Sequence, residues 1–215
     1  MPRAAWRLFF ARRGEVRSVA EMTRRRWIRG LVLVPLALQT RAQARVRPIT
    51  PENFDATKLG AAISAESNRV RLEQKRPRLQ VRAELQAAAE DQAATMVLRL
   101  RPSHDGPFAG RGTAWDRVTR TGLAAEVVTE NVAAISLPTE ASEEKWADTY
   151  EALAAVFVRE WLESPGHRKN LLSREVTQLG CAARIARVPV GPPRVFAVQV
   201  FCRPKDERIK PFIDR

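Results

Sequence analysis

Three side chains that could do acid–base or coordination chemistry lie far apart in the sequence: His104, Glu130 and His167. The two histidines are the only ones in the chain. Glutamate is seldom buried without a partner, so we expect Glu130 either to be exposed or to contact something specific. If the three side chains meet in one cleft, they could hold a divalent metal such as zinc, with water completing its shell. The alternative is that each histidine is a half-buried structural residue that bonds a nearby carbonyl.

The residues around each histidine predict where it is held. Ser164-Pro165 ends one helix and starts a short second one, which places His167 in a first turn where the helix dipole favours a neutral imidazole. The spacing of apolar residues predicts a helix over 84–100, and His104 follows directly after its end. Further helices are predicted over 56–72, from Thr113 to Gly122 with a capping box, and from 149 to 161.

The chain's two cysteines lie in a predicted hairpin formed by residues 177–188 and 194–202. Cys181 lies ten residues before Gly191, and Cys202 lies ten residues after Pro192. A turn between Gly191 and Pro192 would therefore place the two cysteines opposite each other, at a Cα separation of roughly 4.5 to 5.5 Å that suits a disulfide. We expect a bridge between them in an exported protein.

The N-terminal part of the chain has a different composition from the rest. The formal net charge is +13, but the first 44 residues hold ten arginines and two glutamates, and removing them leaves +5. This balance suits a soluble domain and does not require a nucleic-acid partner. Three arginines from Arg24, an apolar run over 31–38 and the small residues Ala42 and Ala44 are typical of an export signal, and they resemble the twin-arginine type. The apolar run is too short to span a bilayer permanently.

These features divide the chain into four parts. Residues 1–44 are predicted to be an extension and signal peptide, in which Met22 is the candidate true start. Residues 45–55 are predicted to be a linker, 56–205 the folded domain and 206–215 a tail. We expect a monomer in the periplasm or outside the cell.

The order of motifs in the domain resembles the CAP superfamily: the cysteine-rich secretory proteins, insect antigen 5 and plant pathogenesis-related proteins. The similarity is strongest to bacterial SCP-like extracellular proteins. It rests on Ser103-His104, Glu130-Asn131-Val132-Ala133, Trp161 to Leu172, Thr177-Gln178-Leu179-Gly180 and Val198 to Phe201. The resemblance implies an α+β fold, an α–β–α sandwich with a central antiparallel sheet. It also implies a cleft at His104, Glu130, Asn131 and His167, although Ser164 stands where animal and plant members carry a second glutamate.

Three functions remain open at this stage. The cleft could hold zinc through His104, Glu130 and His167, and a metal-assisted, protease-like hydrolase could use Glu130 as its base. No nucleophile elbow is evident, and Ser103 is next to His104 in sequence, where adjacent side chains rarely face each other as a serine mechanism requires. The interpretation we favour is a module that binds a small amphipathic or envelope-derived ligand.

Overall fold

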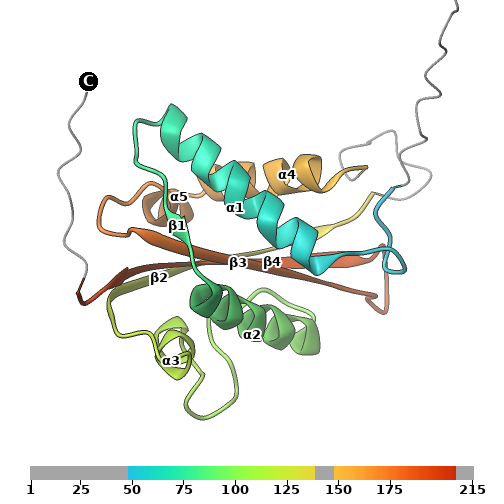
Figure 1. The fold of residues 1–215 in the computed structure, drawn as a ribbon. Coiled ribbons are helices and arrows are strands. Elements are labelled where there is room, and N and C mark those ends of the chain that lie inside the picture. The colour runs from blue at the N-terminus through green and yellow to red at the C-terminus, as the bar shows by residue number, and fades with distance from the viewer. Residues whose placement is uncertain (1–47, 139–147, 207–215) are drawn as a thin grey trace, which may run out of the picture. The chain divides into compact units, whose positions relative to one another are not determined.

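Two helical layers cover the faces of a four-stranded sheet in the computed structural model, which describes residues 48–138 and 148–206 (Figure 1). These residues all belong to the unit Ala44–Arg215. The predicted signal peptide with Met22, most of the predicted tail and the first residues of the predicted linker lie outside the described residues. The α+β sandwich predicted from the resemblance is confirmed.

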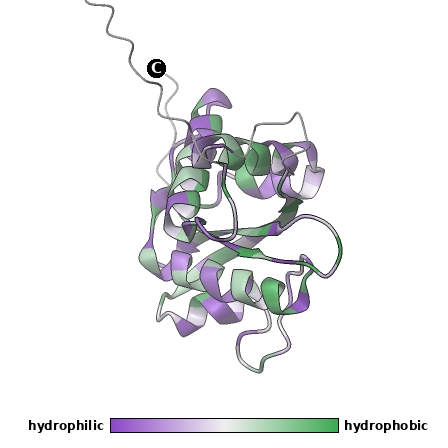
Figure 2. Ribbon diagram, turned by 90° about the vertical axis from the view of Figure 1, so that its right-hand side faces the viewer, coloured by the Kyte–Doolittle hydropathy of each residue, from purple (hydrophilic) through white to green (hydrophobic). Residues whose placement is uncertain are grey.

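The helices begin where local signals place them. Their bounds are α1 Ala56–Glu73, α2 Ala83–Arg99, α3 Ala114–Arg120, α4 Tyr150–Glu163 and α5 Pro165–Leu171. Thr113 and Asp116 form the predicted capping box of α3, in which each side chain accepts a hydrogen bond from the other residue's backbone N–H. Thr149 caps α4 through its side chain, and Pro165 is the first residue of α5. Hydrophobic and hydrophilic residues alternate along the helical ribbons, as expected for helices with one buried face (Figure 2).

The sheet has the strand order β1-β3-β4-β2, with β1 Gln80–Val81, β2 Ala125–Ser136, β3 Gln178–Ala186 and β4 Arg194–Pro204. The three long strands are antiparallel, whereas the two-residue β1 runs parallel to β3, so the sheet is mixed. Because β2 is the last strand in this order, it lies at an edge of the sheet. Since successive side chains of a strand point to opposite faces, β2 sends alternate residues into different helical layers.

Each face of the sheet carries its own core. One core joins the sheet to α1, α4 and α5 and includes Trp161 and Phe201. The other joins it to α2 and α3 and includes Leu85 and Phe196. The packing of α2 on β3 is so close that a Cβ on Gly180 would lie 2.2 Å from the backbone of α2. A glycine is therefore needed at this point of the strand.

The predicted disulfide is wrong, although the hairpin itself is confirmed. Cys181 pairs with Gln199 and Cys202 with Gln178, so the cysteines are not opposite each other and no bridge joins them. The register pairs Ala186 with Arg194, because β4 begins only after two prolines that lack the N–H needed for a ladder hydrogen bond. The actual register differs from the predicted one by three residues, and an odd shift moves one cysteine to the other face of the sheet. Cys181 belongs to the core under α1, and Cys202 to the core under α2.

Candidate functional site

Glu130 lies on the edge strand β2 and its side chain is buried, with 3% of its surface exposed. Its Oε1 lies 3.1 Å from Nδ1 of His104, and its Oε2 accepts a 2.6 Å hydrogen bond from Nη2 of Arg117. Glu130 was expected either to be exposed or to contact something specific, and in the structure it contacts specific partners. Both of its oxygens are engaged by basic side chains.

Arg117 is a site residue that the sequence analysis did not single out. It lies on α3, only 1% of its side chain is exposed, and it pairs with Glu130 in the interior. Its Nη1 donates to the carbonyls of Arg111 and Gly112, and its Nη2 also donates to the carbonyl of His104. One guanidinium thus fixes the glutamate and the backbone of the loop that carries His104. Its residue type gives no signal in the sequence, because the chain has many arginines.

His104 lies in the loop after α2, with 54% of its side chain exposed. The hydrogen bond that the Glu130 carboxylate accepts raises the pKa of His104 above its ordinary value of 6.5, although partial burial and Arg117 act in the opposite direction. Because Nδ1 faces Glu130, the opposite ring nitrogen, Nε2, lies on the side of the ring away from the carboxylate. A carboxylate that holds one ring nitrogen also fixes the ring's orientation.

The next residue of β2, Asn131, points to the other face of the sheet and is fully buried. Its Nδ2 donates to the carbonyl of His167 at 3.0 Å and to Oε1 of Gln199 at 3.1 Å. Its Oδ1 accepts from Nδ2 of Asn170, which also donates to the backbone carbonyl of Glu130. Asn131 therefore holds α5 against the edge of the sheet. Asn170 and Gln199 are two further residues of this network that the sequence analysis did not predict as functional.

The two histidines come from different helical layers and meet beside β2. Their ring centroids are 6.3 Å apart with an interplanar angle of 50°. Burial lowers the pKa of His167 below 6.5, and the charge of His104 lowers it further. The direction of this shift agrees with the neutral imidazole expected at this position, and its causes are burial and the charge of His104. The structure thus brings together all four residues predicted for the cleft.

The arrangement does not fit the predicted zinc site. Both oxygens of Glu130 are occupied, and the cationic guanidinium of Arg117 lies 2.6 Å from one of them. A metal ion would have to compete with that charge for the carboxylate. Within residues 48–138 and 148–206, no group of three or more His, Cys, Asp or Glu side chains is arranged to hold a metal ion.

Ser103 is not positioned as a nucleophile for His104. Its hydroxyl donates to the carbonyl of Asp105 at 2.8 Å and accepts from the N–H of the same residue at 3.1 Å. These bonds stabilise the turn that carries His104. A nucleophile would instead need its hydroxyl within hydrogen-bond distance of the base.

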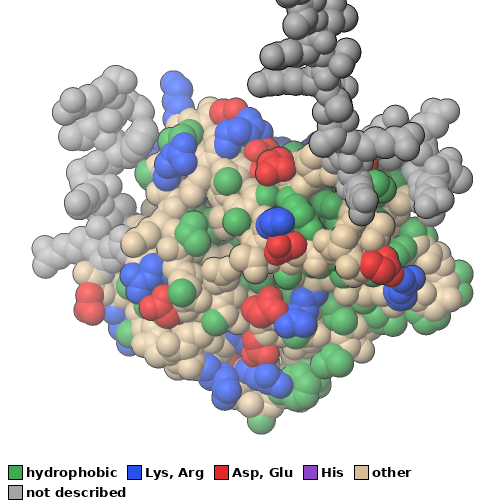
Figure 3. All heavy atoms as spheres, turned by 45° about the vertical axis from the view of Figure 1, so that its right-hand side comes forward, with side chains coloured by type: hydrophobic (Ala, Val, Ile, Leu, Met, Phe, Trp, Pro, Cys, Tyr) green, Lys and Arg blue, Asp and Glu red, His purple; other side chains and the backbone are tan. Residues whose placement is uncertain are grey.

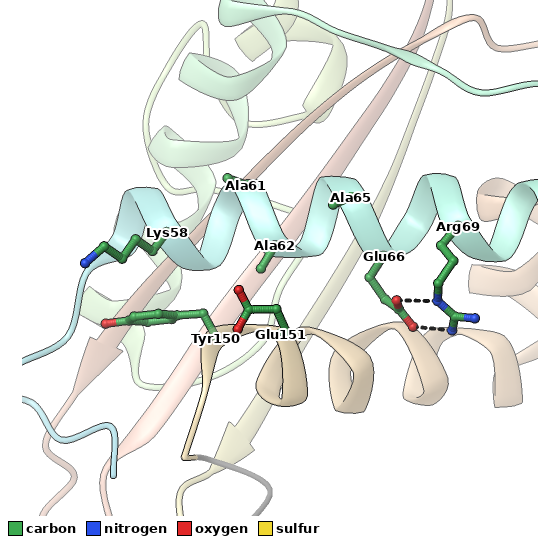
Figure 4. A pocket seen from close by; sticks show the side chains of 8 residues that line it. All are labelled: Lys58, Ala61, Ala62, Ala65, Glu66, Arg69, Tyr150 and Glu151. Carbon is green, nitrogen blue, oxygen red and sulfur yellow. Dashed lines mark hydrogen bonds and ion pairs between the residues drawn. The ribbon is translucent and has the colours of Figure 1, made fainter. Parts of the chain in front are cut away.

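A cavity of about 500 Å³ lies away from the histidines, between α1 and α4 (Figure 4). Its wall combines Ala61, Ala62 and Ala65 of α1 with Tyr150 of α4, and the ion pair between Glu66 and Arg69 lies at one end. The histidine pair is not part of its lining.

None of the described helices is both long and apolar enough to cross a bilayer.

Comparison with known proteins identifies the fold's relatives. The profile of the cysteine-rich secretory protein family (CAP) matches residues 65–201, which is more than half of the chain. No curated protein matches the chain. An extracellular protein containing an SCP domain from Bacillus anthracis is similar, with 26% identity and a TM-score of 0.52. That similarity covers 73% of this chain but 45% of the Bacillus protein, so the chain spans less than half the length of this relative.

An outer surface protein from Borrelia burgdorferi shares the fold at 16% identity, with a TM-score of 0.52. The match covers 71% of this chain and 97% of the Borrelia protein. The matched range 65–201 contains the described α2, α3, α4, α5 and most of the sheet, with every residue of the histidine site. The chain belongs to the cysteine-rich secretory protein family (CAP).

Proposed function

We propose that the protein is exported and that it acts, as a monomer, by binding a small envelope-derived ligand at His104 and His167. Export is supported by the basic and apolar segments of residues 22–44 and by the extracellular or surface location of two structural relatives. The periplasm and the extracellular space both fit this proposal, as does export by the twin-arginine route.

The observation that carries the binding function is the way Glu130 holds His104. The carboxylate fixes one ring nitrogen, and more than half of the side chain stays exposed. A raised pKa favours a protonated His104, whereas the lowered pKa of His167 favours a neutral ring. The pair thus offers one charged donor and one neutral imidazole to the same ligand. Such a pair suits a carboxylate or carbonyl group of a ligand.

The hydrolase hypothesis has weaker support. A general base must be free to take a proton from water, but both oxygens of Glu130 are already engaged by His104 and Arg117. Ser103 is directed to the backbone of Asp105 rather than to the imidazole. These contacts favour recognition of a ligand over its cleavage.

The test is incubation of the purified protein with a cell-envelope extract, followed by mass spectrometry of retained molecules and released fragments. We expect retention without fragments in the wild-type protein and loss of retention in His104→Ala and His167→Ala. Arg120→Ala, on the exposed end of α3, is the matched control and should retain the same molecules. Fragments that disappear in Glu130→Gln would instead establish hydrolysis and refute a pure binding role.

Zinc provides a second measurement. Because Arg117 occupies one oxygen of Glu130, we expect Glu130→Gln to titrate zinc as weakly as the wild-type protein in calorimetry. A stoichiometric zinc site that Glu130→Gln abolishes would refute this interpretation of the carboxylate.

A further inference from the structure

A second concave region lies around α5 and contains four basic side chains. It has a volume of about 530 Å³, and its lining includes Arg76, Arg168, Lys169 and Arg174. Glu175 is the one carboxylate in the lining, which leaves an excess of three positive charges. The volume falls within the range of roughly 300–1,000 Å³ that is usual for small-molecule sites.

The basic residues of this pocket lie close together without acidic partners among the described residues, whereas several other surface arginines are paired. On the face shown in Figure 3, acidic and basic side chains lie next to one another. Arg69, for example, pairs with Glu66 and Glu73 on α1. By contrast, none of the four basic residues of the pocket forms an ion pair with any residue in the described part of the chain. The positive charges of these four side chains repel one another, and an anionic ligand would reduce that repulsion.

Two of the guanidinium groups are held in place through Nε. Arg76 donates from Nε to the carbonyl of Leu172 at 3.0 Å, and Arg168 donates from Nε to the carbonyl of Leu162. In both arginines, the terminal nitrogens Nη1 and Nη2 of the guanidinium have no hydrogen-bond partner among the described residues. A guanidinium that is already oriented loses less conformational freedom when it binds an oxyanion.

A fifth basic residue, Arg71, lies behind the pocket and adds to its positive potential. Arg71 is fully buried, and its Nη1 donates to the carbonyls of Leu171 and Ser173 at 2.7 and 3.0 Å. Its described partners are carbonyls, and its Nη2 has no hydrogen-bond partner among the described residues. Burial, together with the nearby charge of Arg76, lowers the pKa of Arg71 to about 10. An anion in the pocket would offset this unpaired charge.

We infer that the pocket of Arg76, Arg168, Lys169 and Arg174 binds a phosphate group carried on a small ligand the size of a sugar phosphate. The guanidinium fork matches phosphate oxygens in bidentate geometry, and lysine is a common additional phosphate ligand. A dianion neutralises most of the three excess charges, which a single carboxylate would not. The cavity is large enough for a hydroxylated body next to the phosphate, where Glu175 can accept a hydroxyl hydrogen bond. This site involves neither histidine and does not depend on the function proposed for them.

The test uses glucose 6-phosphate and glucose as probes, with calorimetry at low salt on the full-length protein. We expect glucose 6-phosphate to bind, glucose not to bind, and added salt to weaken the binding. Lys169→Gln combined with Arg174→Gln removes two exposed side chains that make no described contact. We expect this variant to bind the phosphate probe roughly tenfold more weakly or worse, the equivalent of about 1.4 kcal/mol.

The matched control is Lys58→Gln combined with Arg120→Gln, which removes the same charge from other parts of the surface and should leave the affinity unchanged. His104→Ala should leave it unchanged as well, which separates this test from that of the histidine pair. Vesicles of phosphatidylglycerol and of phosphatidylcholine distinguish a lipid phosphate from a soluble one. Binding to phosphatidylglycerol alone, lost in the pocket variant, would support the site with a lipid headgroup as the source. The inference is refuted if neither phosphate probe binds, or if both double variants weaken binding equally.

Discussion

The ion pair between Glu130 and Arg117 can be tested by Glu130→Gln, which keeps the shape of the side chain and removes its charge. Both partners are almost completely buried, with 3% and 1% of their side chains exposed, and the contact is 2.6 Å long. In the variant, the guanidinium of Arg117 remains in the interior and its hydrogen-bond partners are carbonyl oxygens and a neutral amide. Glu130 is the ion-pair partner of Arg117 among the described residues, and the carboxylate of Asp116 acts on it only at longer range.

The expected cost follows from the burial of the pair. Removing one partner of a buried ion pair typically destabilises a protein by about 3–5 kcal/mol, because the other charge is left without compensation. Glutamine keeps one acceptor oxygen for the guanidinium, so we expect the lower end, about 3 kcal/mol. Arg117→Met added to Glu130→Gln removes the orphaned charge, so the double variant should be less destabilised than the sum of the two single variants.

The histidines report the same change through the pH dependence of stability. Because its folded pKa is raised above 6.5, His104 stabilises the fold fully below about pH 6.5, and this contribution is lost as the pH rises through the folded pKa. Since the bond to Glu130 is the main cause, the pKa of His104 should fall toward 6.5 in Glu130→Gln. His167 has a lowered pKa, so its contribution has the opposite sign: it is present above about pH 6.5 and is lost as the pH falls through the folded pKa.

The assay is NMR titration of the two imidazoles, which are the only ones in the chain, together with denaturant unfolding between about pH 5 and 8. In the variant, we expect His167 to dominate the histidine contribution, so that the free energy of unfolding increases as the pH rises through this range. An unchanged pKa of His104, or a loss of stability below about 0.5 kcal/mol, would refute the reasoning that Glu130 is a buried partner of both basic residues.

Three further predictions concern the packing. Gly180→Ala should destabilise the fold by about 3 kcal/mol or more in denaturant unfolding, since its Cβ would lie 2.2 Å from the α2 backbone; Gly166→Ala, which meets nothing within 4 Å, is the control and should cost nothing. When the protein is unfolded without reductant and alkylated, mass spectrometry should show two modified cysteines. In the folded protein Cys181 should be protected from alkylation, because burial raises its pKa to about 12. Absence of modification in the unfolded protein would show that Cys181 and Cys202 form a bridge. Asn131→Ala should cost about 2–3 kcal/mol by removing the partner of several buried polar groups, and an unchanged His167 resonance would contradict its positioning role.

The element boundaries could be predicted because their signals are local. Thr113 and Asp116 form their capping box within four residues, and Pro165 starts α5 because it lacks only an N–H that a first helical residue does not use. The strands of the C-terminal hairpin were predictable for the same reason. Their register was not, because it depends on where the ladder resumes after Pro192 and Pro193. A displacement of three residues was enough to separate the cysteines.

The site was predictable only in part, since its residues are joined by contacts across the fold. His104, Glu130 and His167 stand out as residue types, whereas Arg117 is one of many arginines in the sequence. What singles it out is burial next to a carboxylate, a property of the packed α3 and β2. Asn170 and Gln199 are likewise ordinary polar residues until the pairing of β2 with β4 places Gln199 opposite Asn131.

The position of β2 at the edge of the sheet explains how two helical layers contribute to one site. Glu130 and Asn131 are neighbours in sequence, but their side chains point to opposite faces, one toward α3 and the other toward α5. In a central strand, the adjacent strands would keep groups bound to these two residues apart. At an edge, His104 from one layer and His167 from the other can approach to a centroid separation of 6.3 Å. Asn170 also covers the outward carbonyl of Glu130, so the contacts that assemble the site protect the exposed edge from pairing with another strand.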